Sequence, residues 1–167
     1  KEYRRQRQMC IRDSTSVYRD LRAKGETVFT GYSDLETPSR VLGILRDGVP
    51  VSRASAGEIV EVILAETALY AESGGQVADK GVIVGPGYEL DVIDVQKPVP
   101  GLVSHTVEVA TGEVGVDEPA TSIVDAANRR AAAQAHSATH LVHAAIRDTL
   151  GSSCLLYTSP SPRDVEE

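Results

Sequence analysis

The chain has 167 residues, of which 41% are hydrophobic and 25% charged, a composition typical of a soluble globular protein with a sizeable core. Seventeen Lys and Arg against 24 Asp and Glu give a net charge of −7, which argues against nucleic-acid binding through bulk positive charge. No apolar run approaches the roughly 20 residues of a membrane span, and no signal peptide is evident, so no membrane partner is expected.

The two ends of the chain are unpatterned and resemble translated sequencing-adapter DNA. The adapter string ATGTGTATAAGAGACAG translates as Met-Cys-Ile-Arg-Asp, found at residues 9–13, and its reverse complement, read one base in, gives Cys-Leu-Leu-Tyr-Thr, found at 154–158. Segments 1–14 and 154–167 are therefore expected to be non-native tails, with native disordered tails as the alternative. Both cysteines fall in these tails, so the rest suits a reducing, cytoplasmic compartment.

The middle of the chain begins with short β-rich runs. Gly- and Pro-rich connections separate them, and Asp47-Gly48 is a two-residue turn signal. This spacing predicts a small antiparallel β-barrel or sandwich over residues 26–125. The expected strands are 28–32, 40–46, 49–52, 59–64, 81–84, 89–95, 103–109 and 121–124.

Helices are expected on either side of these strands. Residues 15–25 have the spacing of a helix end or linker, and Asp125 can cap a long helix over 126–150. The fold class is therefore α+β, a barrel followed by the opening helix of a second, truncated unit at 126–153. That helix is expected to be marginally stable because it exposes an apolar face, formed by Leu141, Val142, Ala145 and Ile146.

The long helix carries the first motif with chemical potential. His136 and His140 lie one turn apart, and His143 shares their face, so two imidazoles could bind one metal ion. A zincin-type protease would need Glu beside the first His, where Ser137 stands. Two His are also too few for zinc, and the alternative is a polar stripe or a satisfied core histidine.

A glycine-rich stretch is the second motif. In Glu72-Ser73-Gly74-Gly75-Gln76 the paired glycines allow close backbone approach to a ligand, and Gln76 offers donors and acceptors. The stretch lacks the Lys-Ser/Thr ending of a phosphate loop, and a plain connection between strands is the alternative.

Three basic residues are candidate phosphate contacts, namely Lys97, Arg129 and Arg130. Solvated surface charge is the alternative, given the acidic balance of the chain. His105 sits in an alternating strand and is expected to be structural.

Together these motifs resemble those of the alanyl-tRNA synthetase family, in the order expected there, over essentially all of residues 15–153. The resemblance implies the β-barrel and the start of the editing domain, which hydrolyses tRNA(Ala) wrongly charged with serine or glycine. The matching stretches are Phe29-Thr30-Gly31-Tyr32, Thr67 to Gln76, Asp94-Val95-Gln96-Lys97, Val124-Asp125 with Arg129-Arg130, and His136 to His143.

By this resemblance His136 and His140 would be two of four zinc ligands, and Thr139 would face the editing pocket and help reject the cognate alanyl group. The family's other two ligands lie downstream, beyond the point where adapter-like sequence begins. The polypeptide is therefore expected to hold half a zinc site and to hydrolyse nothing by itself.

The resemblance also implies partners. Gly74, Gly75 and Gln76 would lie near the tRNA acceptor end, with Arg129 as a further tRNA contact. Alanine, ATP and Mg²⁺ would belong to the parent ligase, which is expected to be cytoplasmic and to form a homo-oligomer through a region absent here.

Three readings compete with the interpretation of the chain as a piece of the ligase. A free-standing trans-editing deacylase shares the barrel and the His motif, although residues 15–24 resemble the segment that joins a preceding synthetase domain. The threonyl synthetase shares the His motif but should lack the barrel. A non-catalytic RNA-binding barrel would bind tRNA independently of zinc and of His136 or His140.

Overall fold

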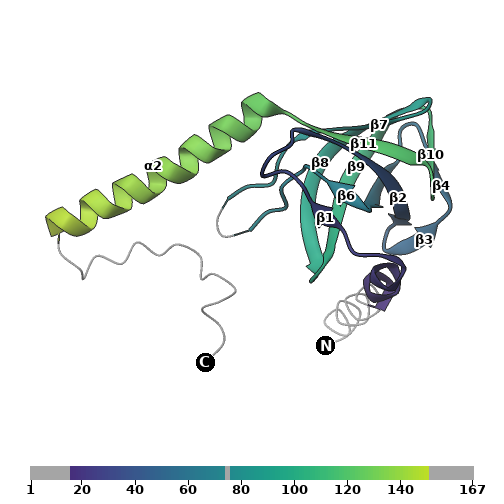
Figure 1. Ribbon diagram of the computed structural model, residues 1–167, viewed down its shortest axis with the longest axis horizontal. Helices are drawn as coiled ribbons and strands as arrows, with labels where there is room; N and C mark the ends of the chain where they lie inside the picture. The colour runs from purple at the N-terminus through teal and green to yellow at the C-terminus, as the bar shows by residue number, and fades with distance from the viewer. Residues whose placement is uncertain (1–15, 74–75, 151–167) are drawn as a thin grey trace, which may run out of the picture.

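Strands and one long helix build the part of the chain that this computed structural model describes, residues 16–73 and 76–150 (Figure 1). The two predicted tails, with Cys10 and Cys154, lie outside the described residues, as do Gly74 and Gly75. The elements are β1 Val28–Phe29, β2 Glu36–Arg46, β3 Val49–Val51, β4 Arg53–Ser55, β5 Ile59–Leu64, β6 Glu66–Thr67, β7 Gly81–Gly85, β8 Tyr88–Val99, β9 Leu102–Thr111, β10 Glu113–Gly115, β11 Pro119–Val124 and α2 Ala126–Leu150.

The main sheet closes on itself as an antiparallel barrel, not a sandwich. Its strands follow the order β11-β7-β8-β9-β5-β2, and β11 pairs back with β2, where Pro119 lies opposite Arg40. Strand β3 extends β2 through a turn in which Asp47 and Gly48 have φ values of 52° and 77°, as the turn signal predicts. Outside the barrel, β1 pairs with β6 in parallel and β4 pairs with β10.

Side chains fill the barrel, as expected for so few strands. Strand β8 alternates buried and exposed residues over much of its length, which gives the barrel an apolar interior and a polar outside. The interior core includes Val41, Ile44, Val62, Ile83, Leu90, Val95 and Val107.

A second, smaller core lies between the barrel wall and the helical residues 16–24. Leu21 is buried there against Leu42, Leu45 and Ile63. The hydroxyl of Tyr18 donates a hydrogen bond to Glu61 Oε2 at 2.5 Å. Burial and this bond to a carboxylate raise the pKa of Tyr18. The expected helix is therefore confirmed, and it packs on the barrel.

The long helix α2 has the bounds that its sequence predicts. The Asp125 carboxylate caps it, with Oδ1 accepting hydrogen bonds of 3.0 Å from the backbone N–H groups of Ala127 and Asn128. Figure 1 shows the helix running away from the barrel. Its predicted apolar face is exposed at Leu141 (72%) and Val142 (55%). Among the described residues, no helix combines the length and apolarity needed to cross a membrane.

Candidate functional site

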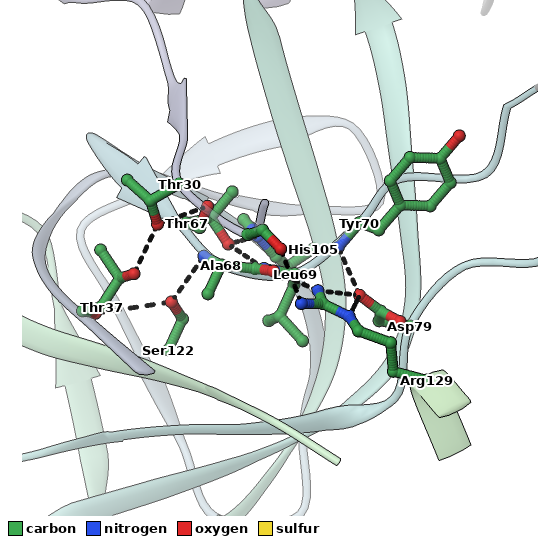
Figure 2. Close-up of polar contacts among 11 residues, drawn as sticks. Thr30, Thr37, Thr67, Ala68, Leu69, Tyr70, Asp79, His105, Ser122 and Arg129 are labelled. Atoms are coloured by element: carbon green, nitrogen blue, oxygen red, sulfur yellow. Dashed lines mark hydrogen bonds and ion pairs between the residues drawn. The ribbon is translucent and has the colours of Figure 1, made fainter. Parts of the chain in front are cut away.

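An irregular buried segment, residues 67–71, lies at the centre of the candidate site (Figure 2). Apart from its first residue it belongs to no strand, so its peptide groups need other partners. Side chains from distant elements supply them. The N–H of Ala68 donates to Ser122 Oγ (3.1 Å), and the N–H of Tyr70 donates to Asp79 Oδ2 (2.8 Å).

His105 lies fully buried in the barrel beside this segment, and its hydrogen bonds define its tautomer. Nδ1 is 2.9 Å from the Val62 carbonyl, which can only accept, so Nδ1 carries the proton. Nε2 then accepts from the Thr67 hydroxyl at 2.9 Å, and Thr67 Oγ1 itself accepts from the N–H of Leu69 at 3.2 Å. Burial lowers the pKa of His105 to about 4, so the ring is neutral at pH 7. The predicted structural role is confirmed.

Arg129, in the first turn of α2, reaches into the same cluster (Figure 2). Nη1 donates to the Gly31 carbonyl at 2.9 Å, and Nη2 donates to the Ala68 carbonyl at 2.5 Å. Nε donates to Asp79 Oδ2 at 3.0 Å, and Nη2 donates to the same oxygen, so both bonds of this ion pair share one acceptor. The side chain is only 20% exposed, so solvated surface charge is the wrong description of Arg129.

The predicted tRNA contact by Arg129 stays a prediction. Four of the five guanidinium N–H donors are engaged within the chain, which leaves one for any other partner. Lys97 and Arg130, the other two basic candidates, are exposed.

Gly31 lets the chain pass close to the buried segment. A Cβ at this position would lie 2.2 Å from the Ala68 carbonyl oxygen and 2.6 Å from the Phe29 ring. The Phe29 ring contacts Tyr32 and Tyr70 edge to face, at centroid distances of 5.0 and 6.0 Å. Tyr32 is 91% exposed.

The glycine-rich stretch is attached to strand β8 at its first residue. The N–H of Glu72 donates to the Val95 carbonyl at 3.0 Å, and Gln96 Nε2 donates to Glu72 Oε2 at 2.8 Å. Beyond it, Ser73 and Gln76 pair as an antiparallel bridge, and Gln76 is half-buried. The predicted contact residues Gly74 and Gly75 lie outside the described residues.

The imidazoles of His136 and His140 lie side by side on α2, with their ring planes at 74°. Their Nε2 atoms are 2.9 Å apart and their ring centroids 4.5 Å apart, with His140 exposed and His136 half-buried. Two nitrogens bound to one tetrahedral zinc would be about 3.3 Å apart, so the pair fits two ligand positions after a small rotation. Residues 16–73 and 76–150 contain no cluster of three His, Cys, Asp or Glu that could complete a metal site.

Thr139 lies exposed between these two histidines in sequence. Its hydroxyl donates a hydrogen bond to the Ala135 carbonyl one turn earlier, at 2.9 Å. The lone pairs of Oγ1 therefore stay available to accept a hydrogen bond from a ligand.

The structure thus brings four sequence motifs into one cluster around residues 67–73: the 29–32 stretch, the glycine-rich stretch, the 94–97 stretch and Arg129. It does not bring the histidine pair into that cluster. At 1.5 Å per helical residue, His136 and His140 lie about 10 and 16 Å along α2 from Arg129. Sequence reasoning missed Asp79 and Ser122, because no local pattern distinguishes them from surface polar residues.

Comparison with known proteins shows to which family the chain belongs. The family model described as tRNA synthetases class II (A) matches residues 1–128, more than half of the chain, so the chain is of the class II tRNA synthetase type. An alanine–tRNA ligase of Leifsonia xyli subsp. xyli is 66% identical over 138 residues, which cover 83% of this chain and 16% of that protein. The alanine–tRNA ligase of Clavibacter sepedonicus is 62% identical over 136 residues, covering 81% and 15%.

More distant relatives carry the same name. The alanine–tRNA ligase of Cutibacterium acnes is 47% identical over 137 residues, which cover 82% of this chain and 15% of that protein. The chain belongs to the alanyl-tRNA synthetase family, and it spans about one sixth of the length of the relatives it matches.

Proposed function

We propose that this chain is the barrel and the opening of the editing domain of a cytoplasmic alanine–tRNA ligase. The complete enzyme attaches alanine to tRNA(Ala) with ATP and Mg²⁺ in another domain, and its editing domain hydrolyses tRNA(Ala) charged with serine or glycine. The observation that carries the proposal is the 66% identity to an alanine–tRNA ligase across a stretch that holds the whole motif cluster.

Size explains why such an enzyme needs a second, hydrolytic site. A pocket that admits alanine cannot exclude glycine, which is smaller, and it discriminates only modestly against the added hydroxyl of serine. Hydrolysis at a separate site removes the products of these errors, so the editing domain supplies the specificity that binding lacks.

His136 and His140 would hold zinc in that site, and their facing Nε2 atoms support this role. Bound zinc supplies Lewis acidity to hydrolysis of the aminoacyl ester. The remaining ligands would come from a more distant part of the enzyme. Thr139, with free lone pairs on its hydroxyl, would help the site reject the alanyl group, which has no hydroxyl to donate.

The tRNA partner would contact the barrel near the glycine-rich stretch. Gly74, Gly75 and Gln76 would approach the acceptor end, and the exposed cations Lys97 and Arg130 would contact phosphates. Arg129 would contribute at most its one remaining donor. A homo-oligomer of the complete enzyme remains part of the proposal.

A chimeric enzyme tests the proposal. Residues 15–153 of this chain replace the matching stretch of the Leifsonia xyli ligase, and two rates are measured: alanylation of tRNA(Ala) and hydrolysis of Ser-tRNA(Ala). The chimera is expected to perform both reactions. Replacing both His136 and His140 with Ala should abolish hydrolysis and lower the zinc content, while alanylation stays unchanged.

Three outcomes would contradict the proposal. Hydrolysis that survives the loss of both histidines would mean that His136 and His140 are not part of the editing site. Two results together would favour a non-catalytic RNA-binding barrel. The 167-residue chain would bind tRNA equally with and without zinc, and the chimera would not hydrolyse Ser-tRNA(Ala). A chain that hydrolyses Ser-tRNA(Ala) by itself would favour the free-standing deacylase.

A further inference from the structure

Helix α2 is attached to the barrel at its first turn. The N–H of Asp125 donates to the Lys80 carbonyl at 2.9 Å, and four residues later Arg129 makes its bonds to Asp79, Gly31 and Ala68. Within residues 16–73 and 76–150, no other side chain of α2 makes a hydrogen bond or ion pair with the barrel. The direction of the helix therefore depends on this one attachment.

We propose that Arg129 and Asp79 are positioning residues that fix the direction of α2 and so place His136 and His140 relative to the barrel. The inference rests on the proposed function, because it takes the histidine pair to be part of the editing site. It assigns Arg129 a role within the chain in place of a contact with tRNA.

The geometry of the guanidinium suits this role. Its planar donors meet acceptors on three separate segments: the Gly31 carbonyl after β1, the Ala68 carbonyl after β6 and the Asp79 carboxylate before β7. Three anchors that do not share a segment resist both tilting and rotation of the helix. A lysine ammonium could keep the ion pair but has no fixed fork with which to hold both carbonyls.

Burial makes the attachment strong as well as directional. Asp79 is 1% exposed, and its Oδ2 also accepts from the N–H of Tyr70, so the carboxylate is itself held in place. Loss of the Arg129 partner would leave a buried charge unpaired, which is strongly unfavourable. Burial of Asp79 therefore favours the state in which Arg129 stays paired with it.

The distance along the helix amplifies any error at the attachment. A tilt of about 10° there would move His136 and His140 by about 2 to 3 Å, given the 1.5 Å rise per residue. Displacements of about 1 Å can slow a reaction on the order of a hundredfold.

Spin-label distances on the 167-residue chain test the attachment directly. With Cys10 and Cys154 replaced by Ser, one pair of labels joins Glu89 of β8 to Gln134 of α2, and a second pair joins Glu89 to Val49 within the barrel; all three label sites are exposed. Arg129→Gln and Asp79→Asn should broaden the barrel–helix distance distribution at least twofold, and Arg129→Lys should broaden it less. The matched control Arg147→Gln, an exposed arginine of the same helix, should leave it unchanged.

The barrel pair shows whether each variant folds. An unchanged barrel–helix distribution in a folded Arg129→Gln chain would overturn the proposal. Should Arg129→Gln or Asp79→Asn fail to fold, the Arg129→Lys chain decides the matter by the same criterion.

The chimeric ligase tests whether the direction of α2 affects the editing reaction. Arg129→Lys should lower kcat for hydrolysis of Ser-tRNA(Ala) on the order of tenfold, with KM, zinc content and alanylation unchanged. A change confined to KM would instead indicate a tRNA contact and overturn the positioning role. A chimera that hydrolyses nothing even without substitution refutes the proposed function alone, since the spin-label distances still decide whether the attachment directs α2.

Discussion

At the scale of single residues, His105 makes the barrel sensitive to acid. The folded chain holds this ring neutral, with a pKa of about 4, whereas in the unfolded chain the pKa returns to the ordinary value of about 6.5. Between these values the unfolded state binds a proton that the folded state does not. The stability due to the neutral ring is complete above pH 6.5 and is lost as pH falls toward 4.

We expect the free energy of unfolding to fall by about 1.4 kcal/mol per pH unit through this window, or about 3 kcal/mol in all, from His105 alone. Denaturant unfolding at several pH values measures it, with His105→Gln as the control. The variant is less stable at pH 7, but the gap between the two proteins should close as pH falls to 4. A gap that is independent of pH would contradict the assignment.

Gly31 is the second residue with a sharp expectation. Alanine there would push a methyl group against the Ala68 carbonyl and the Phe29 ring, so the free energy of unfolding should fall by about 3 kcal/mol. The control is Gly57→Ala, where φ is +87° but nothing lies within 4 Å, so only backbone strain of about 1 kcal/mol is expected. If denaturant titration gave equal losses of unfolding free energy in the two variants, the steric explanation would be refuted.

The candidate site was only partly predictable at this scale. Arg129 and the glycine-rich stretch are recognisable from the sequence, because they belong to a resemblance carried by ordered motifs. The partners of Arg129 are not, since Gly31, Ala68 and Asp79 lie 98, 61 and 50 residues away along the chain. Only the folded structure shows that Arg129, a residue type suited to phosphate binding, uses most of its donors for bonds within the protein.

At the scale of elements, the helical residues 16–24 are part of the barrel module. Leu21 is 4% exposed in the second core, so Leu21→Ala should lower the free energy of unfolding by about 3 kcal/mol, from lost burial and a residual cavity. Leu35→Ala is the control, because Leu35 is 48% exposed and should change stability by less than about 0.5 kcal/mol. A similarly small effect at Leu21 would mean that the helix does not stay docked in solution.

Helix α2 is expected to be the least stable element. Its cap and Arg129 hold the first turn, but the apolar side chains of Leu141, Val142 and Ala145 further along the helix are exposed. Amide hydrogen exchange over 134–150 should be markedly faster than in strand β5, which serves as the protected internal reference. Strong protection across the whole of α2 would contradict this expectation.

Elements were predictable where the pattern is local. Strand β5 and helix α2 follow directly from a β-branched run and from a capped, Ala-rich run. Strands β4 and β10 were missed, because three residues carry no period and each pairs only with the other, about 60 residues away. Their pairing is reinforced by an ion pair of 2.6 Å between Arg53 and Glu113.

At the scale of the whole molecule, the barrel holds its two flanking helices differently. Residues 16–24 dock through an apolar core with one hydrogen-bonded tyrosine, which spreads the contact over a surface. Helix α2 is held by charge at one turn, with most of its length unattached. A load applied to the first helix is therefore shared by the barrel wall, whereas a load on α2 acts on Arg129.

Closure of the barrel has a consequence for synthesis of the chain. Strand β2 pairs with β11, and their facing residues Arg40 and Pro119 are about 80 residues apart. At a ribosomal rate of about 5 to 20 residues per second, one edge of β2 waits about 4 to 16 seconds for its partner to be made. An unpaired edge recruits strands from neighbouring chains. Slow translation of the stretch before β11 would therefore lengthen the interval in which nascent chains on one message can pair with each other.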